Sequence, residues 1–442
     1  MINHIKIRNF GPIRDEVELN FESALPKDDT DEAYVTVMPD DRRLLKLLYI
    51  YGANASGKTT VLQVFEFIRL LWLEPFFNKS EELDFEPFLF CEAPLEQTSS
   101  LELAFYANNI RHIYTLEFTK TMIRSERLVF FHSAKPTLLF SRETDAEKQV
   151  VKLQFGSQIG VPARERDRLE SNTLYNNSVM GAFTKTNVDI PELNTLQTWM
   201  KRFFLGMITS DTDLAETTAD MIVDNPAAAE WIAAFMRKAD RQISKVAADP
   251  EKSYQPRLRP NFVYEHLYPA HVNTPFSTKK RDGILSGLDL SDFKRKVAFT
   301  HETGTGNFEL PLSAESRGTQ RYFALGGPMY RLIHDEALLL IDELESSLHP
   351  DLMKHFLQTF LANATFSQLL ITTHNIALLE EEDFIRRDAL WFIEKKDDGS
   401  ADLYSAADFD SATLRKGASL INAYRAGRLG AKPNLGSPLM NK

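Results

Sequence analysis

The stretch Gly52-Ala53-Asn54-Ala55-Ser56-Gly57-Lys58-Thr59 most constrains this chain, because it follows the pattern Gly-x-x-x-x-Gly-Lys-Thr of a phosphate-binding loop. An apolar run from Leu44 to Tyr51 precedes the loop and is typical of a buried strand. A long apolar segment from Val61 to Trp72 follows and predicts a helix. The polar residues of this segment recur at every third position, which predicts a helix exposed to water only along a narrow stripe (Gln63, Glu66, Arg69).

The residue types of the loop suit the binding of a polyphosphate. Gly52 and Gly57 allow the backbone to wrap around phosphate groups with its N–H groups directed inward, and the next helix adds the positive end of its dipole. Lys58 can reach the β- and γ-phosphates, and the Thr59 hydroxyl can bind Mg²⁺. The other loop residues expected to contact the nucleotide are Asn54, Ala55, Ser56 and Thr60. The alternative, a chance glycine-rich turn, does not account for a strand before the loop and a helix after it.

Length and composition indicate a globular protein of about two units, since 442 residues with 43% hydrophobic and 26% charged residues can bury a large core. The net charge of −11 disfavours the whole surface as a nucleic-acid platform. Two basic runs, Lys279-Lys280-Arg281 and Lys294-Arg295-Lys296, are either a solvated loop face or a local contact to a phosphate backbone.

Several absences in the sequence lead us to expect a cytoplasmic protein. The longest purely aliphatic run, Ala337 to Ile341, is too short to cross a bilayer. The N-terminus alternates like a strand and lacks the apolar core of a signal peptide. Cys91 is the only cysteine, which excludes an intrachain disulfide and argues against a cysteine-based metal site.

The pattern along the chain predicts an α/β fold with a mixed sheet, an antiparallel β subdomain and an inserted helical domain. Residues 3–21 alternate as two strands around a Gly11-Pro12 turn, and residues 99–131 as an antiparallel meander with a turn at Asn108-Asn109. Two apolar helix faces follow in the insertion: Leu196, Trp199, Met200, Phe203 and Met207, then Ile232, Phe235, Met236, Ala239 and Ile243. We expect domains at 1–98 (first part of the loop domain), 99–162 (antiparallel β), 163–260 (helical insertion) and 261–430 (second part), and a mobile tail at 431–442.

A second group of candidate residues follows two later strands. The aliphatic strand Ala337–Ile341 ends in two carboxylates: Asp342 can hold Mg²⁺ through water, and Glu343 can orient and deprotonate an attacking water. His374 follows the next apolar strand and suits a contact to the γ-phosphate. An acidic turn and a structural histidine are the alternatives for these positions.

A third group begins a helix. Ser316-Arg317-Gly318 is a Ser-x-Gly turn that opens a helix and can bind an anion, although many helices start in this way. The order of the groups is more informative than any one of them: phosphate loop, long insertion, Ser-x-Gly turn, Asp-Glu strand, histidine strand.

This order resembles the ABC-type ATPases of the SMC and RecF kind. Among these, the chain is most similar to the AAA-labelled ATPases of bacterial phage-defence and abortive-infection operons, such as AbiL, RloA, PtuA and AriA. The segments that carry the resemblance are Ile5–Phe10, Gly52–Thr59, Ala239–Ile243, Glu315–Arg321, Ile341–Pro350, Thr372–Asn375 and Arg425–Ala431. The chain departs from the ABC signature, since Glu315-Ser316-Arg317-Gly318-Thr319 replaces Leu-Ser-Gly-Gly-Gln, and Gln97 matches the usual glutamine loop by position only.

The resemblance implies an ATPase head that binds ATP and Mg²⁺ and pairs head to tail with a second copy, or assembles into a higher homo-oligomer. Ser316, Gly318 and Thr319 are then expected to cap the γ-phosphate held by the other subunit, and Ser347 to lie in the loop that crosses between the sites. The implied partner is an effector nuclease from a neighbouring gene, with DNA or a phage protein as the trigger and no role for a membrane.

Three other functions remain open from the sequence. One is a RecF-like DNA-repair ATPase that acts directly on DNA, and another is the nucleotide-binding subunit of a transporter, whose usual insertion is much shorter. The third is a built-in nuclease, for which the Asp-x-Asp pairs Asp211/Asp213 and Asp408/Asp410 are candidate metal ligands. Such pairs more commonly cap helices or lie in turns.

Overall fold

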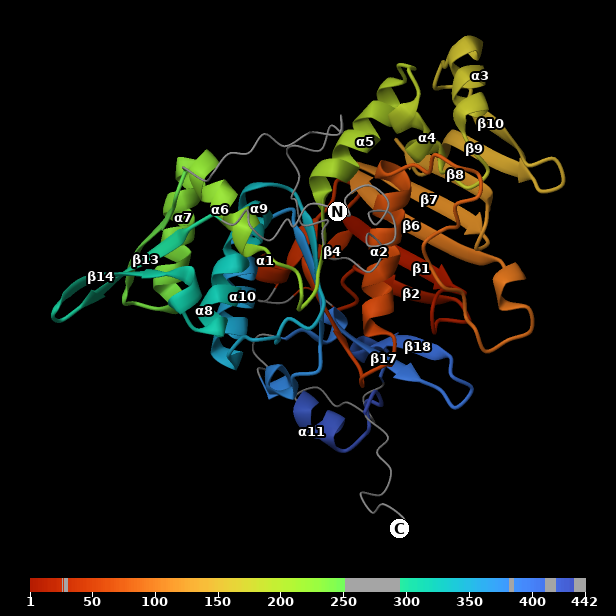
Figure 1. Ribbon diagram of the computed structural model, residues 1–442. Helices are drawn as coiled ribbons and strands as arrows, with labels where there is room; N and C mark the ends of the chain where they lie inside the picture. Colours follow the sequence, from red (N-terminus) through yellow and green to blue (C-terminus); the bar gives the residue numbers. More distant parts are fainter. Residues whose placement is uncertain (26, 28–30, 251–294, 381–384, 410–418, 433–442) are drawn as a thin grey trace. The chain divides into compact units, whose positions relative to one another are not determined.

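The computed structural model describes residues 1–25, 27, 31–250, 295–380, 385–409 and 419–432 (Figure 1). The chain divides into two compact units, which we describe separately: unit 1 comprises Met1–Lys201 and Leu370–Lys442, and unit 2 comprises Arg202–Leu369. The basic run 279–281, Lys294, Asp410 and most of the expected tail lie outside the described residues.

Unit 1 contains a seven-stranded antiparallel sheet in the order β10-β9-β8-β7-β6-β1-β2. Its strands are β1 (Ile2–Arg8), β2 (Val17–Asn20), β6 (Ser99–Ala107), β7 (Ile110–Phe118), β8 (Ile123–Phe131), β9 (Thr137–Asp145) and β10 (Val150–Phe155). Asn108 and Asn109, with φ of 50° and 63°, make the tight turn between β6 and β7, because asparagine tolerates the left-handed region. The predicted strand pair in 3–21 and the predicted meander are confirmed.

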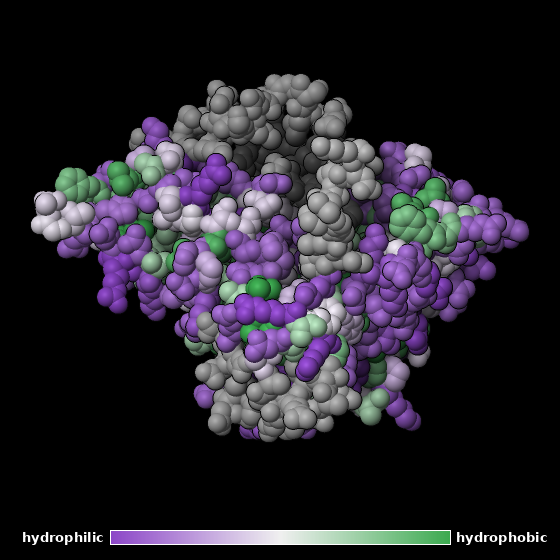
Figure 2. Space-filling view, turned by 90° about the horizontal axis from the view of Figure 1, so that it is seen from below, coloured by the Kyte–Doolittle hydropathy of each residue, from purple (hydrophilic) through white to green (hydrophobic). Residues whose placement is uncertain are grey.

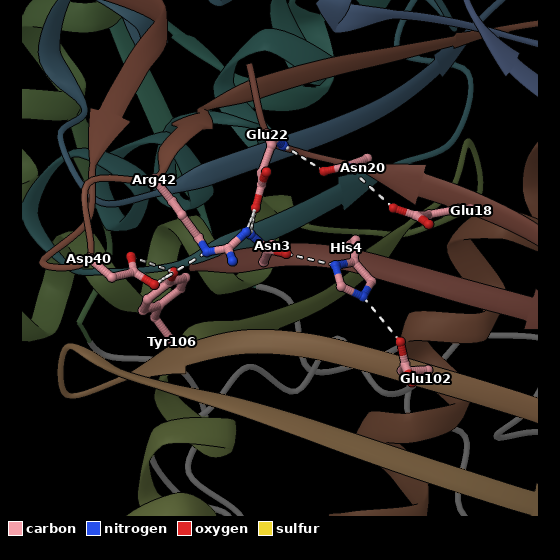
Figure 3. A network of polar contacts seen from close by, with 9 residues as sticks. All are labelled: Asn3, His4, Glu18, Asn20, Glu22, Asp40, Arg42, Glu102 and Tyr106. Carbon is pink, nitrogen blue, oxygen red and sulfur yellow. Dashed lines mark hydrogen bonds and ion pairs between the residues drawn. The ribbon is translucent and has the colours of Figure 1, made fainter. Parts of the chain in front are cut away.

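A polar network fastens the N-terminal strand within this sheet (Figure 3). Its members come from β1, β2, the segment just after β2, β6 and the turn between the short strands β3 (Val35–Val37) and β4 (Arg43–Leu45): Asn3, His4, Glu18, Asn20, Glu22, Asp40, Arg42, Glu102 and Tyr106. His4 Nε2 lies 3.3 Å from Glu102 Oε1, and Lys6 Nζ lies 2.9 Å from the same oxygen. The hydrogen bond to His4, and then that to Lys6, lower the pKa of Glu102 to about 2.

Unit 1 also holds strands in the order β16-β5-β17-β18, where β5 (Leu47–Tyr51) and β17 (Leu390–Lys395) are parallel, while β18 (Ala401–Ser405) is antiparallel to β17. β16 (Gln368–Thr373) begins in unit 2 and ends in unit 1. The prediction of a single strand from Leu44 to Tyr51 is wrong. The segment forms two strands, β4 and β5, that are separated at Lys46, whose N–H donates to Tyr34 O and not to a neighbouring strand.

Helix α2 (Lys58–Leu73) follows β5, as predicted, and packs on the antiparallel sheet. Phe67 stacks on Phe118 of β7, and Trp72 meets Tyr114 of β7 edge to face. The predicted exposed stripe on this helix is wrong. Glu66 and Arg69 are 1% and 5% exposed, and Arg69 donates two hydrogen bonds to the Glu66 carboxylate, so the charges are buried as a pair.

The remaining elements of unit 1 are mostly helices around the sheets. They are α1 (Asp31–Tyr34), α3 (Ala163–Asn172), α4 (Val179–Lys185), most of α5 (Pro191–Phe203) and α11 (Leu420–Arg425). Helix α4 is anchored to β8 through the buried Glu126, whose carboxylate accepts from Val179 N–H at 2.9 Å and from the Tyr114 hydroxyl at 2.9 Å. Burial raises the pKa of Glu126 to about 7, so this carboxyl binds a proton more readily than usual.

Unit 2 combines strands and helices, with two helices in succession both before and after β12-β13-β14. Its strands are β11 (Phe204–Ile208), β12 (Ile243–Ala248), β13 (Val297–Thr303), β14 (Gly306–Pro311) and β15 (Leu338–Ile341); its helices are α6 (Ala215–Asp224), α7 (Pro226–Ala239), α8 (Arg317–Ala324), α9 (Gly326–His334) and α10 (Pro350–Asn363). β11 and β15 are parallel, and β12-β13-β14 form an antiparallel sheet. The core includes the stacked rings of Phe235 and Tyr322, with centroids 4.5 Å apart.

Both helix faces predicted for the insertion include a residue beyond the end of the observed helix. α5 ends at Phe203, and Met207 lies in β11, paired with Leu340 of β15. α7 ends at Ala239, and Ile243 begins β12. In each case pairing with a distant strand overrides the local helical period. With its parallel and antiparallel strands and its antiparallel β subdomain, the chain has the expected mixed α/β fold class.

Hydrophilic residues predominate among the described residues on the face that Figure 2 shows, and the hydrophobic ones form separate groups. Large apolar side chains that are exposed include Phe77 and Phe90, in the segment between α2 and β6, and Phe308 on β14. Scattered apolar side chains are usual on protein surfaces, so these positions by themselves do not indicate a binding site.

Candidate nucleotide-binding site

The phosphate-loop sequence forms a tight loop between β5 and α2 in unit 1. All five residues of β5 are buried, and α2 begins at Lys58. Ala55 (φ 61°) and Gly57 (φ 108°, ψ 10°) are in the left-handed region. Turns of this kind direct successive backbone N–H groups into one concavity, which binds anions.

Close packing explains why the two glycines stand where they do. A Cβ at Gly52 would lie 2.5 Å from Ser56 Oγ and 2.7 Å from the carbonyl oxygen of Ile393 in β17. A Cβ at Gly57 would lie 2.8 Å from the Pro12 ring, and its positive φ disfavours any other residue. The loop is therefore held between β17 and the Gly11-Pro12 turn, whose Pro12 carbonyl accepts from Ala401 N–H at 2.7 Å.

The polar groups of the loop are gathered at its centre. Lys58 is buried, and its ammonium group donates to the carbonyl oxygens of Gly52 at 2.8 Å and Ala53 at 3.0 Å. Ser56 Oγ is buried with no hydrogen-bond partner among the described residues. Asn54 is exposed, and Thr59 and Thr60 are half-buried in the first turn of α2.

His374 lies in the same unit, directly after β16. The Tyr51 hydroxyl, at the end of β5, donates to the carbonyl oxygen of Asn375 at 3.1 Å, so the ends of β5 and β16 meet. Thr373 Oγ1 accepts from Asn375 N–H at 3.0 Å, which turns the chain immediately after the strand. His374 is exposed at this turn.

Asp342 and Glu343 follow β15 in unit 2, as predicted, and both are half-buried. The Asp342 N–H donates to Ile208 O at 2.8 Å, which ties it to the end of β11. Glu343 has φ of 51°, an uncommon conformation for a residue with a side chain. Such strain costs on the order of 1–3 kcal/mol and is most often found at functional sites.

The Ser-x-Gly turn and the Ser347 loop meet within unit 2. Ser316 caps α8, with Oγ accepting from Thr319 N–H at 3.1 Å and lying 2.9 Å from Thr319 Oγ1. A Cβ at Gly318 would lie 3.4 Å from the carbonyl oxygen of Ser347, a residue in the left-handed region (φ 62°). Ser316 and Ser347 are exposed. The structure therefore brings the predicted γ-phosphate cap next to the loop that was predicted to cross between the sites, and both roles stay predictions.

The candidate residues fall into two sets, one in each unit. The phosphate loop and His374 belong to unit 1, whereas the carboxylates, the Ser-x-Gly turn and Ser347 belong to unit 2. Gln97 lies in an exposed loop of unit 1, where its side-chain amide donates to Glu92 O at 3.1 Å. Its role as a glutamine loop stays a prediction.

Other candidates have local structural roles. Asp213 Oδ1 accepts from Ala215 N–H at 3.2 Å at the start of α6, and Asp408 Oδ2 accepts from Ser405 N–H at 2.9 Å in a capping box. Arg295 pairs with Asp220 of α6. Within the described ranges, no group of three or more His, Cys, Asp or Glu side chains is arranged to hold a metal ion.

Sequence reasoning missed the neighbours of the loop. Pro12 and Ile393 pack on its glycines, and Tyr51 connects it to the turn at Asn375. The Gly-Pro turn was visible in the sequence, but its contact with Gly57 depends on the paired sheet strands. The buried strand, the left-handed loop and the helix that starts at Lys58 place the chain in the P-loop class of α/β proteins.

A protein-family profile described as "AAA domain, putative AbiEii toxin, Type IV TA system" matches residues 47–380, more than half of the chain. The chain belongs to this AAA domain family. No curated protein matches it. In the part of the chain that the structure describes, no helix is both long and apolar enough to cross a membrane.

Three solved structures that resemble the chain are SMC heads. An SMC head domain from Thermotoga maritima has 13% identity and a TM-score of 0.39, and covers 91% of this chain and 98% of its own. An SMC head bound to the C-terminal winged-helix domain of ScpA has 10% identity and a TM-score of 0.47, and the match covers 91% of this chain and 97% of the SMC head chain. An SMC head with an extended coiled coil, bound to the C-terminal domain of ScpA derived from Pyrococcus furiosus, has 10% identity and a TM-score of 0.44 (96% and 98% covered). The family assignment rests on the sequence profile.

Proposed function

We propose that this protein is a Mg²⁺-dependent ATPase of the ABC type that controls a partner effector, a nuclease, in defence against phage. The observation that carries the proposal is the phosphate loop: two packed glycines, a left-handed turn and the buried Lys58 ammonium group between a strand and a helix. Membership of an AAA family whose description names an abortive-infection toxin supports the link to defence.

The loop residues fit a polyphosphate. The Lys58 ammonium group lies on loop carbonyl oxygens, from which it can transfer to phosphate oxygens, and the buried Ser56 hydroxyl has a hydrogen bond to give. Thr59 and Asp342 are the proposed Mg²⁺ ligands, the latter through water. A Mg²⁺ ion held by these residues would supply positive charge that offsets the negative charge of the phosphate groups.

Glu343 is the proposed general base. Its carboxylate would accept a proton from the attacking water, and its left-handed backbone, next to the tied Asp342, restricts the directions its side chain can take. His374 is the proposed contact to the γ-phosphate from the turn after β16. An imidazole N–H there can donate a hydrogen bond to charge that develops on the transferred group.

The Ser316 turn is proposed to act on the ATP of a second copy, in a head-to-tail dimer or a higher homo-oligomer. It is exposed, capped and adjacent to Ser347, so both can meet an incoming surface. The N–H groups at the start of α8 would donate to the γ-phosphate only when two heads close on ATP. ATP would then shift the population toward the closed pair.

The defence role is tested in cells that carry this gene with its neighbours. Protection should be lost with Lys58→Ala and with removal of the neighbouring nuclease, and it should persist with a surface control, Glu117→Gln. Protection by the Lys58→Ala protein would reject the ATP-dependent mechanism. Salt-dependent duplex binding by the purified protein alone would favour a DNA-repair ATPase instead.

A further inference from the structure

The turn before α8 is held on one side by a contact between two residues that are not among the candidate nucleotide-binding residues. His301 Nε2, on β13, lies 2.7 Å from Glu315 Oε1, immediately before Ser316. The two side chains are only 12% and 8% exposed. Because a carboxylate only accepts hydrogen bonds, the imidazole nitrogen must carry the proton of this contact, here called the His301–Glu315 bridge.

His301 extends from a firmly paired strand. β13 is the middle strand of its sheet, and His301 is opposite Ile243 of β12 on one side and Phe308 of β14 on the other. Two residues earlier on the same strand, Phe299 is buried edge to face against Phe323 of α8, with centroids 5.4 Å apart. Residues two apart on a strand share a face, so one face of β13 contacts both α8 and Glu315, two residues before the helix begins.

Glu315 is fixed by its backbone as well as its side chain. Its N–H donates to Leu312 O at 3.1 Å, and its carbonyl oxygen accepts from the side chain of Gln320 at 2.8 Å. The next residue, Ser316, makes the cap to Thr319. The bridge is therefore one of three contacts that hold the residue immediately before the Ser316 cap.

We propose that the His301–Glu315 bridge positions the Ser316 turn, and that His301 is thereby a positioning residue for hydrolysis of the ATP bound by a neighbouring subunit. The inference rests on the proposed function. A largely buried carboxylate without a partner is costly, so loss of the imidazole should drive Glu315 toward water and displace Ser316 with it. Displacements of about 1 Å can lower a rate about a hundredfold.

The test compares four purified proteins: the parent, His301→Ala, His301→Gln, which keeps an N–H donor, and Glu309→Gln, an exposed charge on β14 that serves as the control. Deuterium exchange of the peptide covering residues 312–325 reports whether the turn is held. ATP turnover at saturating ATP reports whether the turn is placed for hydrolysis. Calorimetry reports how tightly a single head binds ATP.

For His301→Ala we expect exchange in that peptide to be about threefold faster or more. Turnover should fall about tenfold or more while the Kd for ATP stays within about twofold. His301→Gln should recover most of both losses, and Glu309→Gln should match the parent. Should His301→Ala fail to fold, Glu315→Ala removes the other half of the bridge and is expected to behave in the same way.

Unchanged exchange and turnover in His301→Ala would overturn the inference, as would equal losses in His301→Ala and His301→Gln. A parent without ATP turnover would reject the proposed function. In that case faster exchange in His301→Ala, recovered in His301→Gln, would still support the bridge as the support of the turn.

Discussion

Gly318 and Ser347 lie in contact: a Cβ on Gly318 would be 3.4 Å from the carbonyl oxygen of Ser347. The contact joins the start of α8 to the loop that follows the Asp-Glu strand, so the two surfaces proposed to meet a second subunit form one surface within unit 2. Because Ser347 is exposed and Gly318 is only half-buried, this surface is suited to an interface in which each subunit completes the site of the other.

The first prediction tests this interface. Ser316→Arg should leave ATP binding to a single head nearly intact and block hydrolysis, because a large cation replaces the cap at the start of α8. Mixed with Lys58→Ala subunits, it should regain part of the activity, since one of the two interfaces in a mixed pair then carries neither lesion. No recovery in an ATPase assay, with mixed assemblies confirmed by mass, would exclude composite sites.

The second prediction concerns the cation of the phosphate loop. Lys58→Ala removes the buried ammonium group from the loop and should weaken ATP binding about tenfold or more. Isothermal titration calorimetry gives the Kd, with circular dichroism as a check of folding. Equal affinity in the parent and Lys58→Ala would mean that this loop does not bind the nucleotide.

The third prediction separates binding from hydrolysis. Glu343→Gln keeps the shape of the side chain but accepts a proton poorly, so ATP should bind normally while turnover falls about a hundredfold or more. Single-turnover and steady-state assays measure the loss. If turnover falls less than about threefold, another group deprotonates the water.

The fourth prediction concerns loop packing. Gly52→Ala would place a methyl group 2.7 Å from the backbone of Ile393, so the loop or β17 must shift. We expect lower ATP affinity and a lower Tm. The free energy of unfolding should fall by about 1–3 kcal/mol, as it does at overpacked sites. The matched control is Gly304→Ala, since a Cβ there meets nothing within 4 Å. Similar effects of the two substitutions would argue against a packing role for Gly52.

The fifth prediction is a pH dependence of stability from Glu126. Burial raises its folded-state pKa to about 7, above the ordinary value of 4.5. The contribution of this carboxyl to stability is therefore fully present below pH 4.5 and is lost as the pH rises through 7, because the buried group resists losing its proton. The loss is on the order of 3 kcal/mol. Glu102, with its pKa lowered to about 2, acts in the opposite sense and only between pH 4.5 and 2.

Denaturant unfolding from about pH 5 to about pH 8 measures this effect. The free energy of unfolding should fall less steeply with pH in Glu126→Gln than in the parent. The amide of this variant has only one oxygen, so it cannot replace both carboxylate oxygens that accept from Tyr114 and Val179. The substitution should therefore lower the free energy of unfolding at every pH measured. Glu117→Gln, at an exposed position of β7, should keep the slope of the parent. Identical slopes in Glu126→Gln and the parent would contradict a raised pKa.

Local patterns predicted the elements that carry the candidate site. The loop between a buried strand and a helix, the Ser316 cap and the strand that ends just before Asp342 all depend on neighbouring residues, and the structure has each of them. The roles of the site residues stay predictions. The alternation that predicted the meander is also local, because side chains on a strand point to opposite faces.

The sequence by itself therefore determined the α/β class, the strand, loop and helix around the Gly-x-x-x-x-Gly-Lys-Thr motif and the AAA domain family, because short-range periodicity and a short motif encode them. The tertiary structure alone decided that Met207 is in a strand, that Glu66 and Arg69 are buried as a pair, and that Ser347 meets Gly318. The pairing of Met207 and the contact of Ser347 join segments far apart in the chain, and the Glu66–Arg69 pair, although local to one helix, is buried by the packing of that helix. Strand pairing and burial contribute more free energy there than the local preference of a residue, which is worth less than about 1 kcal/mol.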